Sequence, residues 1–190
     1  MFNEAKTAQA AAYLLYKAGG TMHHIKLMKL LYLADRLSWQ LNECSISGDD
    51  YYSLPYGPVL SNTLNLMRGE TLNRLPSIWE EWISDKENHQ VSLAKHVDTS
   101  DEYFWGELSL SDEEILNDVF KKYGSLDRFT LVELTHDPRY IPEWENPHGG
   151  AKKIPLERLL SYIGKTKEQI QSILEELEEL EHIDRLFKGK

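Results

Sequence analysis

The sequence lacks the features of exported and membrane-spanning proteins. It contains a single cysteine, Cys44, so it can form no internal disulfide and has no CxxC pair for a metal or redox site. No segment approaches eighteen consecutive apolar residues, and no N-terminal stretch combines a charged start, an apolar run and a small-residue cleavage site. We therefore expect a soluble protein of the reducing cytoplasm, with no membrane partner.

Motifs of catalysis and of cofactor binding are also missing from the sequence. There is no P-loop, no GxGxxG, no HExxH and no GxSxG. His23 and His24 are adjacent, so on a helix they would point about 100° apart and would not chelate as an i, i+4 pair does. A zinc site would have to recruit His136 or His148 through the fold. We expect no catalytic residue, no metal and no cofactor, and a protein that is not an enzyme.

The chain has little positive charge where a nucleic-acid-binding protein would need it. Its formal net charge is −10, and residues 70–118 carry 13 acidic and three basic side chains, whereas the flanking regions are close to neutral. A nucleic-acid binder displaces counterions with a basic face, so this balance disfavours one. The acidic block is either a solvated face that aids solubility or a surface complementary to a basic partner.

Length and periodicity predict a mainly α protein. The 190 residues, 41% of them hydrophobic, suit one domain with an appendage. We expect a single compact helical domain of about seven helices with a small β-hairpin in residues 90–107, plus a C-terminal amphipathic helix. Capping residues, prolines and glycines place these helices at residues 4–18, 21–41, 58–68, 78–86, 111–122, 130–136, 155–163 and 166–187. The predicted division is a domain over residues 1–164 and a helix over residues 165–190.

Four short motifs stand out along the chain. The run KLMKLLYLADR, Lys26 to Arg36, has a helical period but is apolar on nearly every side, as a helix in the middle of a domain would be. It is followed by Tyr-Gly-Pro-Val at residues 56–59, Thr-His at residues 135–136 and Pro-Glu-Trp at residues 142–144. A helix of the first kind is suited to packing and not to chemistry.

This order of motifs resembles the Panacea domain of SocA-like proteins, most clearly over residues 25–67 and 110–164. The resemblance implies an antitoxin of a bacterial or phage toxin–antitoxin pair, which neutralises a toxin from an adjacent gene by direct protein contact. SocA-like members also suggest a rival role, that of an adaptor that delivers the toxin to a protease. A second rival is a helix-turn-helix regulator over residues 21–39. Its recognition helix would have apolar residues at too many positions, so too few polar side chains would be exposed to contact the bases.

Several motif residues are candidates for partner contact. Tyrosine and tryptophan give large rigid contact areas, so we expect Tyr52, Tyr56 and Trp144 to be aromatic anchors, with Lys29 and Arg36 as polar contacts. The alternative is structural: a packed turn around the tyrosines, and a solvated stripe formed by Lys26, Lys29 and Arg36 on the central helix. His136 is expected to hold the Pro142–Trp144 loop by hydrogen bonds. The remaining motif positions are assigned to the fold, namely Lys26, Tyr32, Gly57, Pro58, Thr135 and His136.

The last predicted helix has a hydrophobic stripe beside a glutamate-rich face. The stripe consists of Ile170, Ile173, Leu177, Leu180 and Phe187, with Asp184 interrupting it. Fewer than three sound heptads make a poor free-standing coiled coil, so the stripe must dock elsewhere. Its own domain, a groove on a toxin, and a second copy of the chain in a homodimer are the three places left open.

Overall fold

The computed structural model describes residues 1–70, 77–86, 88–101 and 103–188 of the chain. Within these ranges eight helices and six strands follow one another in the order α1 Glu4–Lys17, β1 Thr21–His23, α2 His24–Asn42, β2 Tyr51–Leu54, β3 Gly57–Leu60, α3 Ser61–Met67, α4 Ile78–Trp82, β4 Ile83–Lys86, β5 Gln90–Leu93, α5 Leu110–Tyr123, α6 Arg128–His136, β6 Lys152–Lys153, α7 Leu156–Tyr162 and α8 Lys167–Lys188.

The predicted fold class is wrong in its β content. The chain forms two three-stranded antiparallel sheets, ordered β1-β5-β4 and β3-β2-β6, so it has mixed α/β content with helices in the majority. Every strand is only two to four residues long. Strand β1 pairs with β5, with Thr21 opposite Ser92. Such short strands with distant partners leave no local alternation that a sequence pattern could reveal.

Two predicted helices lose residues to these sheets. The helix expected from Pro58 begins at Ser61, because Gly57 takes a left-handed φ of 97° and turns the chain back along β2. Pro58 then lies in β3, an edge strand, where a missing N–H is tolerated. The helix expected to reach residue 86 ends at Trp82, and β4 takes the remaining residues as the partner of β5. The expected second arm of the hairpin, beyond Val97, contains no strand among its described residues.

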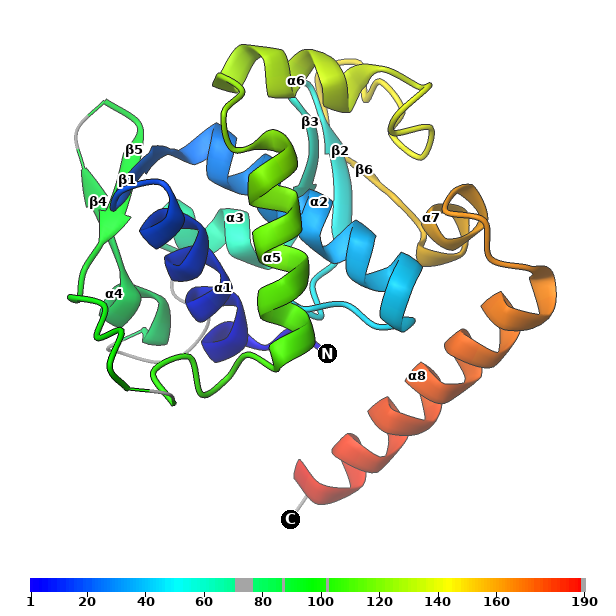
Figure 1. Cartoon of the computed structure of the whole chain (residues 1–190). Coiled ribbons are helices and arrows are strands. Elements are labelled where there is room, and N and C mark those ends of the chain that lie inside the picture. Colours follow the sequence, from blue (N-terminus) through cyan, green and yellow to red (C-terminus); the bar gives the residue numbers. More distant parts are fainter. Residues whose placement is uncertain (71–76, 87, 102, 189–190) are drawn as a thin grey trace.

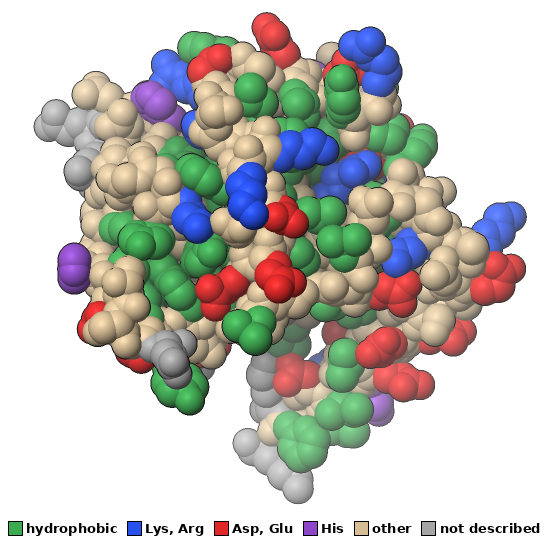
Figure 2. Space-filling view, viewed as in Figure 1, with side chains coloured by type: hydrophobic (Ala, Val, Ile, Leu, Met, Phe, Trp, Pro, Cys, Tyr) green, Lys and Arg blue, Asp and Glu red, His purple; other side chains and the backbone are tan. Residues whose placement is uncertain are grey.

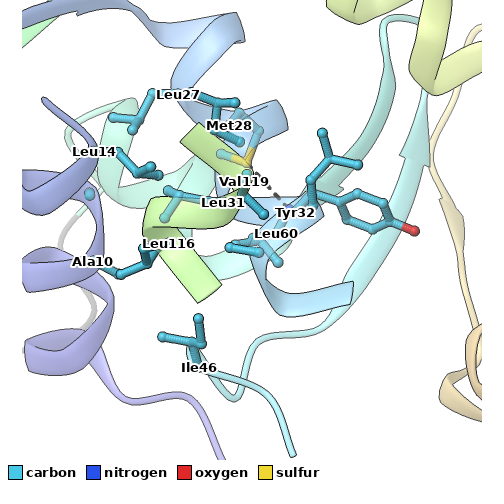
Figure 3. Packing of buried hydrophobic residues seen from close by; sticks show 14 of the residues in the cluster. Ala10, Leu14, Leu27, Met28, Leu31, Tyr32, Ile46, Leu60, Leu116 and Val119 are labelled. Atoms are coloured by element: carbon cyan, nitrogen blue, oxygen red, sulfur yellow. Dashed lines mark hydrogen bonds between the residues drawn. The ribbon is translucent and has the colours of Figure 1, made fainter. Parts of the chain in front are cut away.

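Helix α2 runs through the middle of the fold (Figure 1). Helices α1 and α5 cover one of its sides, the β3-β2-β6 sheet and α6 cover another, and the β1-β5-β4 sheet lies at the far end of α1. Buried alanines along α1, from Ala8 to Ala12, let it approach its neighbours closely. In Figure 3 leucines of α1, α2 and α5 meet in one cluster with Leu60 of β3. The sequence prediction of a buried central helix is therefore confirmed.

Helix α8 leaves the body of the molecule after a turn at Gly164 (Figure 1). Its start is capped as predicted: Thr166 N–H donates to Gln169 Oε1 and Gln169 N–H donates to Thr166 Oγ1. Ile173 is buried against the core cluster, and Leu177 is partly buried there. Its last two turns project away from the domain. The division of the chain at residue 164 into two domains stays a prediction.

Candidate functional site

Three of the sequence motifs meet at the ammonium group of Lys29. This side chain comes from the buried face of α2 and is only 1% exposed. Its Nζ donates a 2.8 Å hydrogen bond to the carbonyl of Pro58. A Cβ at Gly57 would lie 2.7 Å from both Lys29 Nζ and Thr135 Oγ1, and the φ of 97° is one that residues with a side chain rarely adopt, so both contacts and backbone favour glycine there. Burial lowers the pKa of Lys29 to about 7.

The fourth motif reaches the same helix one turn further on. Glu143, which lies between Pro142 and Trp144, is 1% exposed and accepts a 2.8 Å hydrogen bond from Tyr32 Oη. Its carboxylate also accepts a 2.6 Å bond from Arg36 Nε. Burial, and then the Glu143 charge, raise the pKa of Tyr32 well above its usual value. The loop after α6 is thereby fixed to α2 by a charged group that water does not reach.

Asp35, one turn after Tyr32 on α2, binds the loop that follows the helix and β2. Its carboxylate accepts 3.0 Å bonds from the backbone N–H groups of Ile46 and Ser47, a bond from Ser47 Oγ, and a 3.1 Å bond from Tyr51 Oη. Burial raises the pKa of Asp35 to about 6, although the hydrogen bonds act in the other direction. The partners of Asp35 lie in the following loop and in β2, outside its own helix.

His136 and Trp144 support the turn between β2 and β3, and the prediction that His136 holds the Pro142–Trp144 loop by hydrogen bonds is wrong, because both of its ring nitrogens face backbone carbonyls elsewhere. His136 Nδ1 lies 2.7 Å from the Val132 carbonyl, and its Nε2 lies 2.9 Å from the Pro55 carbonyl. Trp144 Nε1 donates a 3.1 Å bond to the Leu54 carbonyl, and the two rings meet edge to face at 4.4 Å. Among the described residues no group of three or more His, Cys, Asp or Glu side chains is placed to hold a metal ion.

We call this arrangement the buried polar junction, which joins α2 to the β2–β3 turn, α6 and the 137–145 loop. Its polar atoms are hydrogen-bonded to elements that are far apart in the sequence. It consists of Lys29, Tyr32, Asp35, Arg36, Gly57, Pro58, Thr135, His136 and Glu143.

The five residues expected to contact a partner are placed very differently. Tyr56 is 68% exposed at the tip of the β2–β3 turn, whereas Tyr52 and Trp144 are half-buried beside it. Arg36 is half-buried through its bond to Glu143, and Lys29 is internal. The structure thus brings all five residues to one side of α2, and of these Tyr56 is the one that is largely exposed to solvent. Contact of these residues with a partner stays a prediction.

The expected cationic stripe on α2 does not form. Lys29 is internal, and Lys26 Nζ donates a 2.6 Å bond to the carbonyl of Gly124 at the end of α5. Burial lowers the pKa of Lys26 as well.

Sequence reasoning missed the roles of Asp35 and Glu143. Glu143 could have been found as the acidic residue inside the Pro-Glu-Trp motif, but its partner lies 107 positions away.

Comparison with known proteins places the motifs in one family. The family described as "Antitoxin SocA-like, Panacea domain" matches residues 27–145, well over half of the chain. These residues include every part of the buried polar junction. No curated protein and no solved structure matches the chain. Among the described residues, no helix is both long and apolar enough to cross a membrane. The chain belongs to the SocA-like antitoxin family, the Panacea-domain proteins.

Proposed function

We propose that this chain is an antitoxin that neutralises a toxin, encoded by an adjacent gene, through direct protein contact. The observation that supports this most strongly is the family match over residues 27–145, which takes in both ends of the buried polar junction. In this proposal the protein acts by binding and carries out no catalysis.

The division between an internal junction and an exposed surface supports a binding role. Lys29, Asp35 and Glu143 are buried and engaged with other parts of the chain, so they maintain the shape of the domain. A stable complex needs an interface on the order of 1,600 Å². Such an area requires a rigid scaffold with variable surface side chains, and loops on a fixed frame provide that.

Tyr56 is the best-placed aromatic anchor on the motif side of the molecule. It stands at the tip of the β2–β3 turn, whose backbone carbonyls at residues 54 and 55 face Trp144 Nε1 and His136 Nε2. A rigid turn under an exposed tyrosine loses little entropy when a partner covers the ring. We propose that Tyr56, with the edges of Tyr52 and Trp144, forms one part of the toxin-binding surface.

Co-expression in bacteria tests the proposal. The product of the neighbouring gene is expressed with and without this protein, and growth and co-purification are scored. Growth arrest that is relieved by co-expression, together with a stable complex, is the expected result. If the product of the neighbouring gene does not slow growth and does not co-purify with this protein, the proposal is wrong.

The half-life of the toxin, measured with and without this protein, separates direct neutralisation from the adaptor role. An adaptor would shorten the half-life of the toxin, whereas masking leaves that half-life unchanged or longer. We expect an unchanged or longer half-life. A regulator reading DNA through α2 has little support, because most of that helix lies inside the domain.

A further inference from the structure

The last turns of α8 and the N-terminal segment of the chain face each other across an open groove. Two hollows of about 610 Å³ and 300 Å³ share the side chains of Met1, Asn3, Leu177 and Leu180 as lining. The larger extends to Ile78, and the smaller extends to Trp39 and the 43–48 loop. Figure 2 shows the space between α8 and the body at the lower edge of the molecule. We call these joined hollows the α8 groove.

The α8 side of this groove is apolar and uncovered. Leu180 is 55% exposed and Ile183 is 48% exposed, and both line the larger hollow. The stripe continues past the hollow to Phe187, which is 79% exposed. Large apolar side chains gathered on one helix face in this way mark an interaction surface.

The opposite wall of the groove is built rigidly. Asn3 N–H donates a 2.9 Å bond to the Ser47 carbonyl, and the Asn3 side chain caps α1 by accepting from Lys6 N–H. Gly48 has a φ of 66°, and a Cβ there would lie 2.1 Å from the carbonyl oxygen of Met1. The N-terminal backbone therefore lies directly on the 45–48 loop. A wall held in this way is already formed before a ligand arrives, which lowers the entropic cost of binding.

The charge of the groove indicates what it can hold. Its lining residues carry five carboxylates, against the Lys6 ammonium and the α-amino group of Met1. Lys6 is paired with Asp112 at 2.8 Å, Glu43 is paired with Lys165 at 2.7 Å, and Glu4 accepts hydrogen bonds from Ser77 Oγ and Trp79 N–H, whereas Glu176 and Glu181 stand on the α8 wall. The carboxylates belong to Glu4, Glu43, Glu176, Glu181 and Asp184. A second copy of this chain would bring the same acidic helix against itself, and like charges at an interface cost free energy. The complementary ligand is apolar on one face and basic at its edges.

We propose that the α8 groove binds a basic amphipathic helix of the toxin. From Ile173 to Asp184 the wall of α8 is about 16 Å long, so about three turns of a partner helix can lie along it. Apolar side chains at i, i+3, i+4 and i+7 of that helix enter the groove beside Leu180 and Ile183, while its lysines or arginines face Glu176 and Glu181. The assignment of this helix to the toxin rests on the proposed antitoxin function.

A synthetic helix tests the groove without the toxin. The probe is a peptide of about 15 residues with leucine at the i, i+3, i+4 and i+7 positions and lysine elsewhere, titrated into the full-length chain by fluorescence anisotropy. We expect binding that weakens at least tenfold in the double variant Leu180→Ser, Ile183→Ser. The control is Leu110→Ser, which changes a leucine of α5 that is 81% exposed and lies outside the groove, and this variant should bind the peptide as the unchanged chain does.

Charge variants test the recognition of basic edges. Glu176→Gln with Glu181→Gln should weaken binding three- to tenfold and reduce its salt dependence, whereas Glu178→Gln with Glu179→Gln, the same charge change on residues outside the groove lining, should not. Equal binding by all variants, or equal binding of a peptide with glutamate in place of lysine, would overturn the proposal.

Two further outcomes identify a different occupant. A dimer in solution that the Leu180→Ser, Ile183→Ser variant dissolves would assign the groove to a second copy. Protection of the last α8 turns from hydrogen exchange in the isolated monomer would show that α8 closes on its own body. Either result would overturn the proposal.

Co-expression then links the groove to the toxin. If the unchanged chain rescues growth and the double leucine–isoleucine variant does not, the groove binds the toxin. If both rescue equally, the antitoxin function stands and the groove assignment fails. If neither rescues but the peptide still binds the unchanged chain, the proposed function fails and the groove remains a binding site for basic helices.

Discussion

The buried polar junction and the α8 groove show opposite distributions of polar and apolar side chains. In the junction, charged and hydroxyl groups lie inside the domain and are hydrogen-bonded to distant parts of the chain. In the groove, leucine and isoleucine are exposed and the carboxylates surround them. The first arrangement fixes a single fold, because each buried polar group has few acceptable partners. The second leaves apolar side chains exposed to water, and a partner can cover them.

This contrast predicts that substitutions in the junction change folding, whereas substitutions in the groove change binding. Pairs of substitutions that place the same or a similar residue type in two environments test this contrast, and the pH dependence of stability tests the buried charges.

The largest effect is expected from Glu143→Ala. It removes the acceptor of both Tyr32 Oη and Arg36 Nε and leaves a half-buried cation without its partner. Breaking a buried ion pair costs about 3–5 kcal/mol, so the free energy of unfolding in urea should fall by that amount. Glu145→Ala is the control, since Glu145 pairs with Lys152 and Arg158 near the surface and should cost under about 1 kcal/mol. Similar losses in the two variants would contradict the internal role of Glu143.

A smaller but still large effect is expected from Gly57→Ala. The new methyl group would meet Lys29 Nζ and Thr135 Oγ1 at 2.7 Å, in addition to the strain of a positive φ. We expect a loss of about 2–4 kcal/mol of unfolding free energy. Gly69→Ala provides the control, because Gly69 has a φ of 77° and nothing within 4 Å of an added Cβ. That variant reports the backbone strain alone, about 1 kcal/mol. Equal effects would mean that the Lys29 contact is not tight.

The free energy of unfolding should depend on pH through the two buried ionisable groups Asp35 and Lys29. Between pH 3.8 and 6 the folded chain holds a proton on Asp35 that the unfolded chain has lost, so this group's contribution to stability falls as pH rises. Between pH 7 and 10.5 the unfolded chain holds a proton on Lys29 that the folded chain has lost, so stability rises with pH. The joint contribution is lowest between pH 6 and 7, and one pKa unit corresponds to about 1.4 kcal/mol.

Urea unfolding at a series of pH values from 4 to 10 measures this profile. Lys29→Met should remove most of the rise above pH 7 and retain the fall between pH 4 and 6, and the part of the rise that remains is assigned to Lys26, whose pKa burial also lowers. A Lys29→Met chain with the same rise would assign that rise to another group.

The smallest effect on folding is expected in the groove. Leu180→Ala removes an exposed side chain and should change the unfolding free energy by less than about 0.5 kcal/mol. Ile173→Ala, two turns earlier on the same helix, removes a buried side chain and should cost about 2–4 kcal/mol. Chemical denaturation of the two variants measures both changes in unfolding free energy. A large loss in Leu180→Ala would mean that the end of α8 packs on the domain in solution.

Local signals in the sequence predicted the helical part of the fold well. The apolar period of α2, the Thr166–Gln169 cap of α8 and the glycine after α7 depend on neighbours within a few residues. Two other helix starts were predicted two and three residues too late, since the N-caps are Ser109 and Asp127 and the expected ones were Ser111 and Thr130. In both cases an adjacent residue with an equivalent side chain competed for the same role.

The sheets and the buried polar junction were not predictable in the same way. Strand β4 follows α4 directly and is set by its pairing with β5, and β6 has only two residues. The partners of Lys29, Tyr32 and Asp35 lie between 11 and 111 positions away. A lysine that looks like part of a solvated stripe becomes internal only when the β2–β3 turn covers it. These assignments depend on tertiary structure that no local window contains.

The separation between Tyr32 and Glu143 has a consequence for protein synthesis. Helix α2 is made early, but the carboxylate that completes its polar face is translated 111 residues after Tyr32. Until that part of the chain leaves the ribosome, Arg36 and Tyr32 lack their acceptor and the 137–145 loop cannot cover them. Contacts that close such long loops form slowly, and incomplete chains expose surface that chaperones and proteases recognise. Interrupted translation would therefore leave chains whose α2 lacks its cover, and only finished chains would add to the folded protein in the cell.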